Sequence, residues 1–124
     1  MPFVISAELA GLIQSLRSLW AVELLLLLQR RPDRVWPVDD LVGELRSSRA
    51  LVDSVLSRLH ELDMVERLSD GSYRYRCAST ANEELVSDLS RLHAERPLAI
   101  AQALHGGPDE KLRAFSDAFR LKKD

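Results

Sequence analysis

Arginine carries all of the positive side-chain charge in the first 110 residues, because no lysine occurs before Lys111. A guanidinium group is planar and presents several N–H donors, which suits paired contacts with phosphate or carboxylate groups. The same preference for arginine is typical of a GC-rich genome. Arginine usage alone therefore leaves open whether these side chains bind an anionic partner.

Residue types that support catalysis or metal binding do not fall into a working pattern. The three histidines are separated widely along the chain, and Cys77 is the single cysteine, so neither zinc-ligand spacing nor a thiolate cluster is present. The histidines are His60, His93 and His105. The paired acids at 39–40 and 83–84 each open a predicted helix, where the helix dipole favours negative charge. The sequence also contains no Gly-rich phosphate loop and no nucleophile elbow. We expect no metal, no cofactor and no enzymatic activity.

Hydrophobic periodicity predicts a mostly α-helical chain with one small β-hairpin. A first long helix is expected from Ser6 to Pro32, and its second half, from Trp20 to Leu28, is apolar nearly all round. Shorter helices are expected after Pro37 and from about Arg49 to Leu62. Trp20 and Trp36 both lie in apolar pattern, so we expect core packing for them ahead of a ligand pocket.

The β-hairpin is predicted from Met64–Leu68 and Tyr73–Cys77, which flank Asp70-Gly71, a dipeptide typical of tight hairpin turns. Arginines alternate with apolar and aromatic residues along both strands, so they share one face. This face either contacts a phosphate backbone or is simply solvated, and the alternation is the same in both cases. The arginines are Arg67, Arg74 and Arg76.

Helical pattern returns after the hairpin. Thr80 and Glu83 form a capping box ahead of an amphipathic helix that extends to about Arg96, and Pro97 interrupts it. A last helix is expected to begin at Pro108. It would place three apolar residues on one side, namely Leu112, Phe115 and Phe119.

Composition limits the partners and the compartment. The 124 residues carry a formal net charge of −2 and the basic residues are scattered, so strong nonspecific attraction to nucleic acid is not expected. One cysteine suits a reducing compartment. The longest apolar run, Leu24–Leu28, is far too short to span a bilayer, and no signal-peptide pattern is visible at the N-terminus. We expect a cytoplasmic protein with no membrane partner.

From Ser18 to Ala78 the predicted order is helix, short strand, helix, tight turn, helix and two-stranded hairpin. In this order the segment resembles the winged helix-turn-helix regulators of bacteria, of MarR-like and PadR-like type. The residues that carry the resemblance are Leu24 to Leu28, Trp36-Pro37-Val38-Asp39-Asp40-Leu41, Leu51 to Leu62, Met64-Val65-Glu66-Arg67 and Asp70-Gly71. The resemblance implies a winged helix-turn-helix core at 18–78. The N-terminal part of the first helix (1–17) and a C-terminal helical dimerisation or interaction region (79–124) would flank it.

In such regulators the third core helix enters the major groove of double-stranded DNA and the wing contacts the flanking backbone. The resemblance therefore implies a DNA-binding transcription regulator with a recognition helix at about 49–62 and a wing at 64–77. The residues implied to contact DNA are Ser47, Ser48, Arg49, Ser54, Ser57, Arg58, Arg67, Arg74 and Arg76.

The predicted helix-turn-helix departs from this pattern in its charge. Between Val38 and Leu62 acids outnumber arginines, no Lys, Asn or Gln occurs, and Asp53 is expected to face the groove, where phosphates repel it. An alternative hypothesis is a winged-helix adaptor that binds another protein and does not bind DNA specifically. A continuous positive stripe on the folded protein would favour DNA binding, and a broken or acidic one the adaptor.

Apolar stripes outside the predicted core indicate a further contact surface. We expect a homodimer, because a small winged helix does not need these residues and a two-fold axis would pair them. The stripes are Leu9, Leu12, Ile13 and Leu16 before the core and Leu85, Leu89 and Leu92 after it. The segment with Leu112, Phe115 and Phe119 is expected to dock on the neighbouring subunit or to stay available to a second protein.

Overall fold

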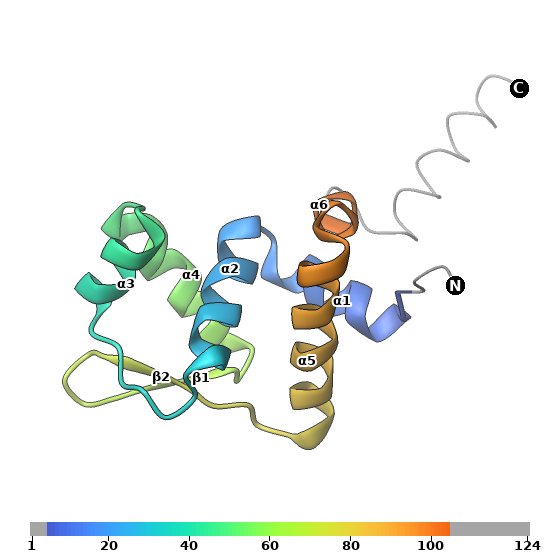
Figure 1. The fold of residues 1–124 in the computed structure, drawn as a ribbon. Coiled ribbons are helices and arrows are strands. Elements are labelled where there is room, and N and C mark those ends of the chain that lie inside the picture. The colour runs from blue at the N-terminus through green and yellow to red at the C-terminus, as the bar shows by residue number, and fades with distance from the viewer. Residues whose placement is uncertain (1–4, 105–124) are drawn as a thin grey trace, which may run out of the picture.

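The computed structural model describes residues 5–104, which form six helices and one two-stranded sheet (Figure 1). The elements are α1 (Ala7–Leu16), α2 (Leu19–Arg30), α3 (Val38–Leu45), α4 (Arg49–Glu61), β1 (Val65–Arg67), β2 (Tyr73–Tyr75), α5 (Thr80–Glu95) and α6 (Pro97–Leu104). The prediction of a mostly helical chain with one small hairpin is confirmed. The helix expected from Pro108, with Leu112, Phe115 and Phe119, lies outside the described residues.

The single long helix expected from Ser6 to Pro32 is wrong, because the chain breaks at Arg17 and Ser18. Arg17 adopts a left-handed conformation with φ of 70°, and the Ser18 hydroxyl accepts a hydrogen bond of 3.1 Å from the Ala21 amide. Serine is a preferred helix cap, and here it starts α2 in a new direction, bent by 106° from α1. Within residues 5–104 no single helix is long and apolar enough to cross a membrane, and α1 and α2 reach that composition only as this bent pair.

Helices α3 and α4 meet across the predicted tight turn. Arg46 ends α3 in a left-handed conformation with φ of 51°, and the Ser48 hydroxyl caps α4 by accepting a hydrogen bond from the Leu51 amide. Inward residues of α4 pack on α2 and α3 as expected from their periodicity. They are Val52, Val55, Leu56 and Leu59.

The predicted hairpin is confirmed. Strands β1 and β2 pair antiparallel with Glu66 opposite Arg74, and Gly71 supplies the positive φ of 87° that the turn requires. Trp36 adds an isolated bridge to Tyr73, with hydrogen bonds of 2.7 and 2.9 Å between their backbones. This bridge is the short extended segment expected before α3, and it ties the start of α3 to the hairpin.

Helices α1, α5 and α6 pack on one another, and α2 lies between them and the α3, α4 and hairpin group (Figure 1). The expected stripe residues are buried inside this single chain, with half-buried Leu85 as the exception. The buried members are Leu9, Leu12, Ile13, Leu16, Leu89 and Leu92. The expectation that these stripes need a second chain is therefore corrected, because α1, α5 and α6 cover each other. The α5 cap is also one residue earlier than predicted: the Ser79 hydroxyl, not Thr80, accepts from the Asn82 amide.

Candidate nucleic-acid interface

The N-terminal end of α4 is where the resemblance places the first base-reading arginine. Arg49 is exposed there, but its Nη1 lies 2.5 Å from Oδ1 of Asp39 and its Nε lies 3.8 Å from Oδ2 of Asp53. Asp39 comes from the first turn of α3, which the tight turn brings alongside α4, and Asp53 is one helical turn further along α4. The guanidinium that would approach DNA is thus already paired with two carboxylates.

The hairpin arginines are paired in the same way. Glu66 on β1 faces Arg74 on β2, and its carboxylate accepts from Arg74 at 2.6 Å and from Arg76 at 3.5 Å. Hydrogen bonding from Arg74, aided by the charges of Arg74 and Arg76, holds the pKa of the Glu66 carboxyl below its usual value. The face of the hairpin that would contact a phosphate backbone therefore includes the Glu66 carboxylate, which is hydrogen-bonded to Arg74 and Arg76.

The two remaining candidate arginines also have partners in the chain. Arg67 donates from Nε to the Tyr73 hydroxyl at 2.8 Å, and its guanidinium lies 5.5 Å from the centre of the Tyr73 ring. Arg58 is half-buried, with Nη1 4.0 Å from the Glu61 carboxylate one turn along α4. Arg67 is opposite Tyr73, on the other face of the hairpin from Arg74 and Arg76, so the expectation that the three arginines share one face is wrong. Arg58 lies beside an acid of its own helix.

The candidate serines divide into structural and exposed ones. The Ser47 hydroxyl is buried with no hydrogen-bond partner, and the Ser48 hydroxyl is used in capping α4. The expected outward placement of Ser47 is therefore corrected. Ser54 and Ser57 are exposed on the outer side of α4, as predicted. Only these two present hydroxyl groups to a partner without first leaving a structural role.

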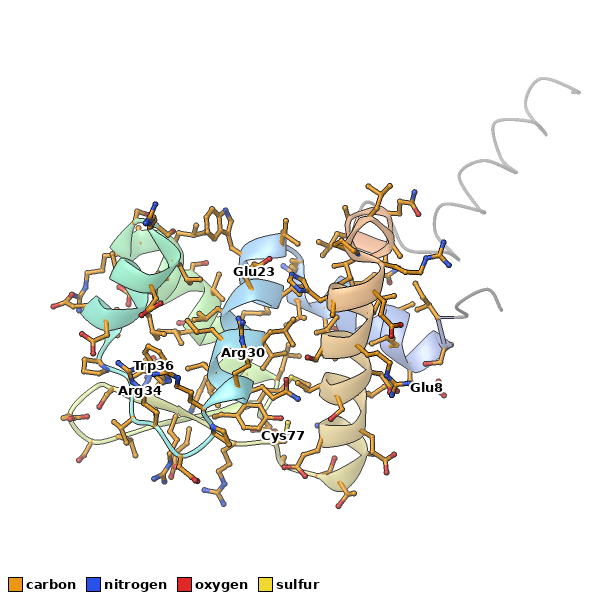
Figure 2. The ribbon with its side chains drawn as sticks, viewed as in Figure 1. Glu8, Glu23, Arg30, Arg34, Trp36 and Cys77 are labelled. Carbon is orange, nitrogen blue, oxygen red and sulfur yellow. The ribbon has the colours of Figure 1, made fainter. Side chains whose placement is uncertain are left out.

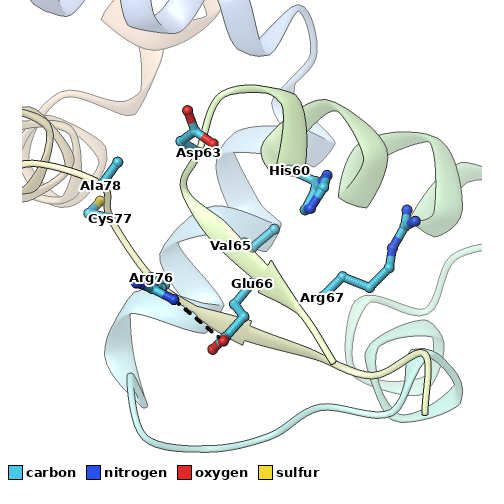
Figure 3. Close-up of a pocket in the computed structure, with 8 residues that line it drawn as sticks. All are labelled: His60, Asp63, Val65, Glu66, Arg67, Arg76, Cys77 and Ala78. Atoms are coloured by element: carbon cyan, nitrogen blue, oxygen red, sulfur yellow. Dashed lines mark hydrogen bonds and ion pairs between the residues drawn. The ribbon is translucent and has the colours of Figure 1, made fainter. Parts of the chain in front are cut away.

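A polar hollow lies between the C-terminal end of α4 and the hairpin (Figure 3). Figure 3 shows Glu66 joined to Arg76 on one side of it, with His60 and Arg67 on the other. Cys77 also lines this hollow, and burial raises the pKa of its thiol, so a reactive thiolate is disfavoured. The described residues contain no group of three or more acidic, histidine or cysteine side chains arranged to hold a metal. The hollow thus contains one thiol whose pKa is raised, and no metal-ligating cluster among the described residues.

The two tryptophans differ, although the sequence led us to expect core packing for both. Trp36 is buried as predicted, and Arg34 lies over its ring at 3.7 Å (Figure 2). Trp20 is 42% exposed, so its predicted core position is wrong. Leu19 beside it is 46% exposed. Both residues lie in the first turn of α2, directly after the break at Ser18, and not within a continuous helix.

The pairing of the candidate arginines with carboxylates was not predicted from the sequence. Asp53 follows Arg49 by four residues, a spacing that places both on one side of a helix, and this signal was available. A two-residue turn at Asp70-Gly71 would oppose Arg67 to Arg74, whereas the observed register opposes Glu66 to Arg74, so this pair did not follow from the predicted turn. Contact between Asp39 and Arg49 depends on how α3 crosses α4, which local pattern does not specify.

Comparisons of the chain with family models, with curated proteins and with solved structures return no match.

Proposed function

We propose that the chain is a winged-helix adaptor, a module that binds another protein and does not read DNA sequence. The element order supports the winged-helix assignment, since α2, the Trp36 bridge, α3, α4 and the β1–β2 hairpin follow one another as that fold requires. The tight turn between α3 and α4 and the bridge that ties the hairpin to α3 support it further.

The observation that carries the proposal is the pairing of the candidate arginines with carboxylates. Arg49, Arg74 and Arg76 each have a carboxylate within 3.5 Å. Exposed ion pairs of this kind are individually weak, so each arginine is able to leave its partner. The carboxylate would then remain beside a DNA phosphate, where like charges repel. The face therefore gains little from phosphate, whereas a protein surface can satisfy both signs of charge.

DNA binding remains a second candidate because one observation favours it. The outer side of α4, with Ser54 and Ser57, is exposed and is not covered by any described part of the chain. If this helix reads DNA, Arg49→Ala and Arg58→Ala each weaken specific binding by about 1–3 kcal/mol, and Arg74→Ala weakens all sequences alike. No change in the three variants rules out this candidate.

The homodimer is a separate prediction. The residues expected to form its interface are buried within one chain, apart from half-buried Leu85. A dimer in which the α4 helices of two chains read successive major grooves would need another contact. Sedimentation of the intact chain at micromolar concentration measures this directly, and a monomer removes the two-half-site arrangement.

Site-specific photo-crosslinking in cells tests the adaptor proposal. A photoreactive amino acid replaces Ser54 on the outer side of α4, and the matched control replaces Ser87, an exposed serine on α5. We expect the Ser54 probe, and not the Ser87 probe, to join the chain to one protein, which must then bind the purified chain and lose affinity on Ser54→Arg. Crosslinking of the Ser54 probe to DNA would contradict the proposal.

A further inference from the structure

An apolar groove lies between the start of α2 and the end of α3, away from the helix-turn-helix contacts described above. The α2–α3 groove is lined by Leu19, Trp20, Glu23, Glu44 and Leu45. Leu19 and Trp20 are two of the four large hydrophobic residues that are exposed within residues 5–104. Tryptophan is enriched among the residues that contribute most to binding at protein interfaces.

The groove is lined by three apolar residues and two acidic ones. Glu23 on α2 and Glu44 on α3 contribute the two carboxylates. Glu23 also lies 2.8 Å from His93 in the last turn of α5. This contact places the end of α5, and therefore the start of α6, beside the groove. An occupant should offer apolar side chains on one side and positive charge around them.

The chain's own C-terminal segment has both properties. Its apolar residues Leu112, Phe115 and Phe119 have the i, i+3 and i+7 spacing that helices use to anchor in grooves. Between residues 111 and 124 the sequence has five cations and two acids. The cations are Lys111, Arg113, Arg120, Lys122 and Lys123. They match the Glu23 and Glu44 carboxylates in sign.

The segment is also long enough to reach the groove. Helix α6 begins at Pro97, packs against α2, and ends at Leu104. Figure 1 shows α6 at the end of the molecule where α2 begins. Eight helical residues advance about 12 Å. Six further residues, 105–110, span up to about 20 Å when extended. Because α6 starts beside the groove, its end lies within about 12 Å of that start. The linker 105–110 is longer than this, so residues 111–124 can return to the groove.

We propose that residues 111–124 dock in the α2–α3 groove of the same molecule. Leu112, Phe115 and Phe119 cover Leu19 and Trp20, and the basic side chains approach Glu23 and Glu44. The segment then competes with any outside helix of the same character, so the groove is a self-occupied docking site. This occupancy does not depend on whether the α4 face binds a protein or DNA.

A labelled peptide of residues 108–124, titrated into the intact chain, tests the occupancy. A tethered segment has an effective concentration of about 1 mM, so an added peptide of about 100 μM intrinsic affinity should bind about tenfold more weakly than to an empty groove. We therefore expect Phe115→Ser with Phe119→Ser in the full chain to raise the affinity for the peptide about tenfold. Adding Trp20→Ala to that variant should abolish the gain, whereas Leu98→Ser, at an exposed site on α6 outside the groove, should preserve it.

Equal affinity of the peptide for the wild-type chain and the Phe115→Ser, Phe119→Ser variant would overturn the proposal, as would no binding to either. Sedimentation of the same two proteins distinguishes the source of the segment. A wild-type dimer that dissociates in the variant would show that the segment comes from a second copy, which contradicts docking within one molecule. Monomers in both samples, together with the gain in peptide affinity, support it.

Discussion

Helices α1, α5 and α6 and the α3, α4 and hairpin group share α2 but differ in what they leave on the surface. The α1, α5 and α6 group buries its apolar stripes within one chain, with Ile13, Leu89 and Leu92 fully inaccessible. The α3, α4 and hairpin group exposes the outer side of α4, and its arginines form ion pairs with nearby acids. The first group therefore has a structural role, and a partner of this chain is to be sought on the second group or in the α2–α3 groove.

The largest expected effect on the free energy of unfolding comes from removing a buried side chain of the α1, α5 and α6 group. Leu89→Ala removes a fully buried side chain and should lower the free energy of unfolding by about 2–5 kcal/mol. Leu98→Ala, at a residue 69% exposed, is the control and should change it by less than about 0.5 kcal/mol. Urea denaturation at two protein concentrations measures both variants. A loss for Leu89→Ala that depends on protein concentration would mean that a second chain covers Leu89, contrary to this account.

A smaller effect is expected at the break between α1 and α2. Ser18→Ala removes the hydroxyl that caps α2 and should cost about 1 kcal/mol. Ser15→Ala, an exposed serine within α1, should change the free energy of unfolding by less than about 0.5 kcal/mol. If the two variants unfold alike, the Ser18 hydroxyl does not cap α2 in solution.

The ion pair between Glu66 and Arg74 on the hairpin predicts a small dependence of the free energy of unfolding on pH. The pKa of Glu66 is lower in the folded chain than in the unfolded chain, so its contribution is complete above the unfolded pKa and is lost as pH falls through the folded pKa. NMR titration of the Glu66 carboxyl should give a midpoint below that of a free glutamate. Arg74→Gln should move this midpoint upward, and an unchanged midpoint would show that Arg74 does not hold Glu66 in solution.

The smallest expected effect concerns Cys77 at the edge of the hairpin. Burial and the nearby charge of Glu83 raise the pKa of its thiol, so alkylation at pH 8 should be slower than that of a free cysteine. Glu83→Gln should speed the reaction modestly by removing the charge contribution. A rate equal to that of free cysteine would mean that the hairpin edge is open to solvent.

Local signals were sufficient to predict most of the α3, α4 and hairpin group. The period of the apolar residues located α4, and Asp70-Gly71 located the hairpin turn within a few residues. Both features depend on neighbours in sequence. Their positions can therefore be predicted without knowledge of the rest of the fold.

The sequence did not determine what covers the apolar stripes. A stripe such as Leu9, Ile13 and Leu16 looks the same whether α5 and α6 or a second chain packs on it. The break at Ser18 was equally hidden, because serine occurs both inside helices and at their caps. The pairing of Asp39 with Arg49 arises only when α3 crosses α4. These features depend on tertiary contacts, and they decide how the candidate site is interpreted.

The most direct test of the central claim measures DNA affinity before and after the carboxylates are removed. Asp39→Asn, Asp53→Asn and Glu66→Gln are combined to release Arg49, Arg74 and Arg76. The control makes the same change in net charge on α5, with Glu83→Gln, Glu84→Gln and Glu95→Gln, which are exposed. Fluorescence anisotropy with a labelled duplex is recorded over a range of salt concentrations.

We predict weak binding without sequence preference for the wild type and the control. The released variant should bind more tightly, with a salt dependence steeper by up to about three in log–log slope, because each arginine that reaches a phosphate contributes about 0.9. Tight, sequence-specific binding by the wild type, unchanged in the released variant, would contradict the account.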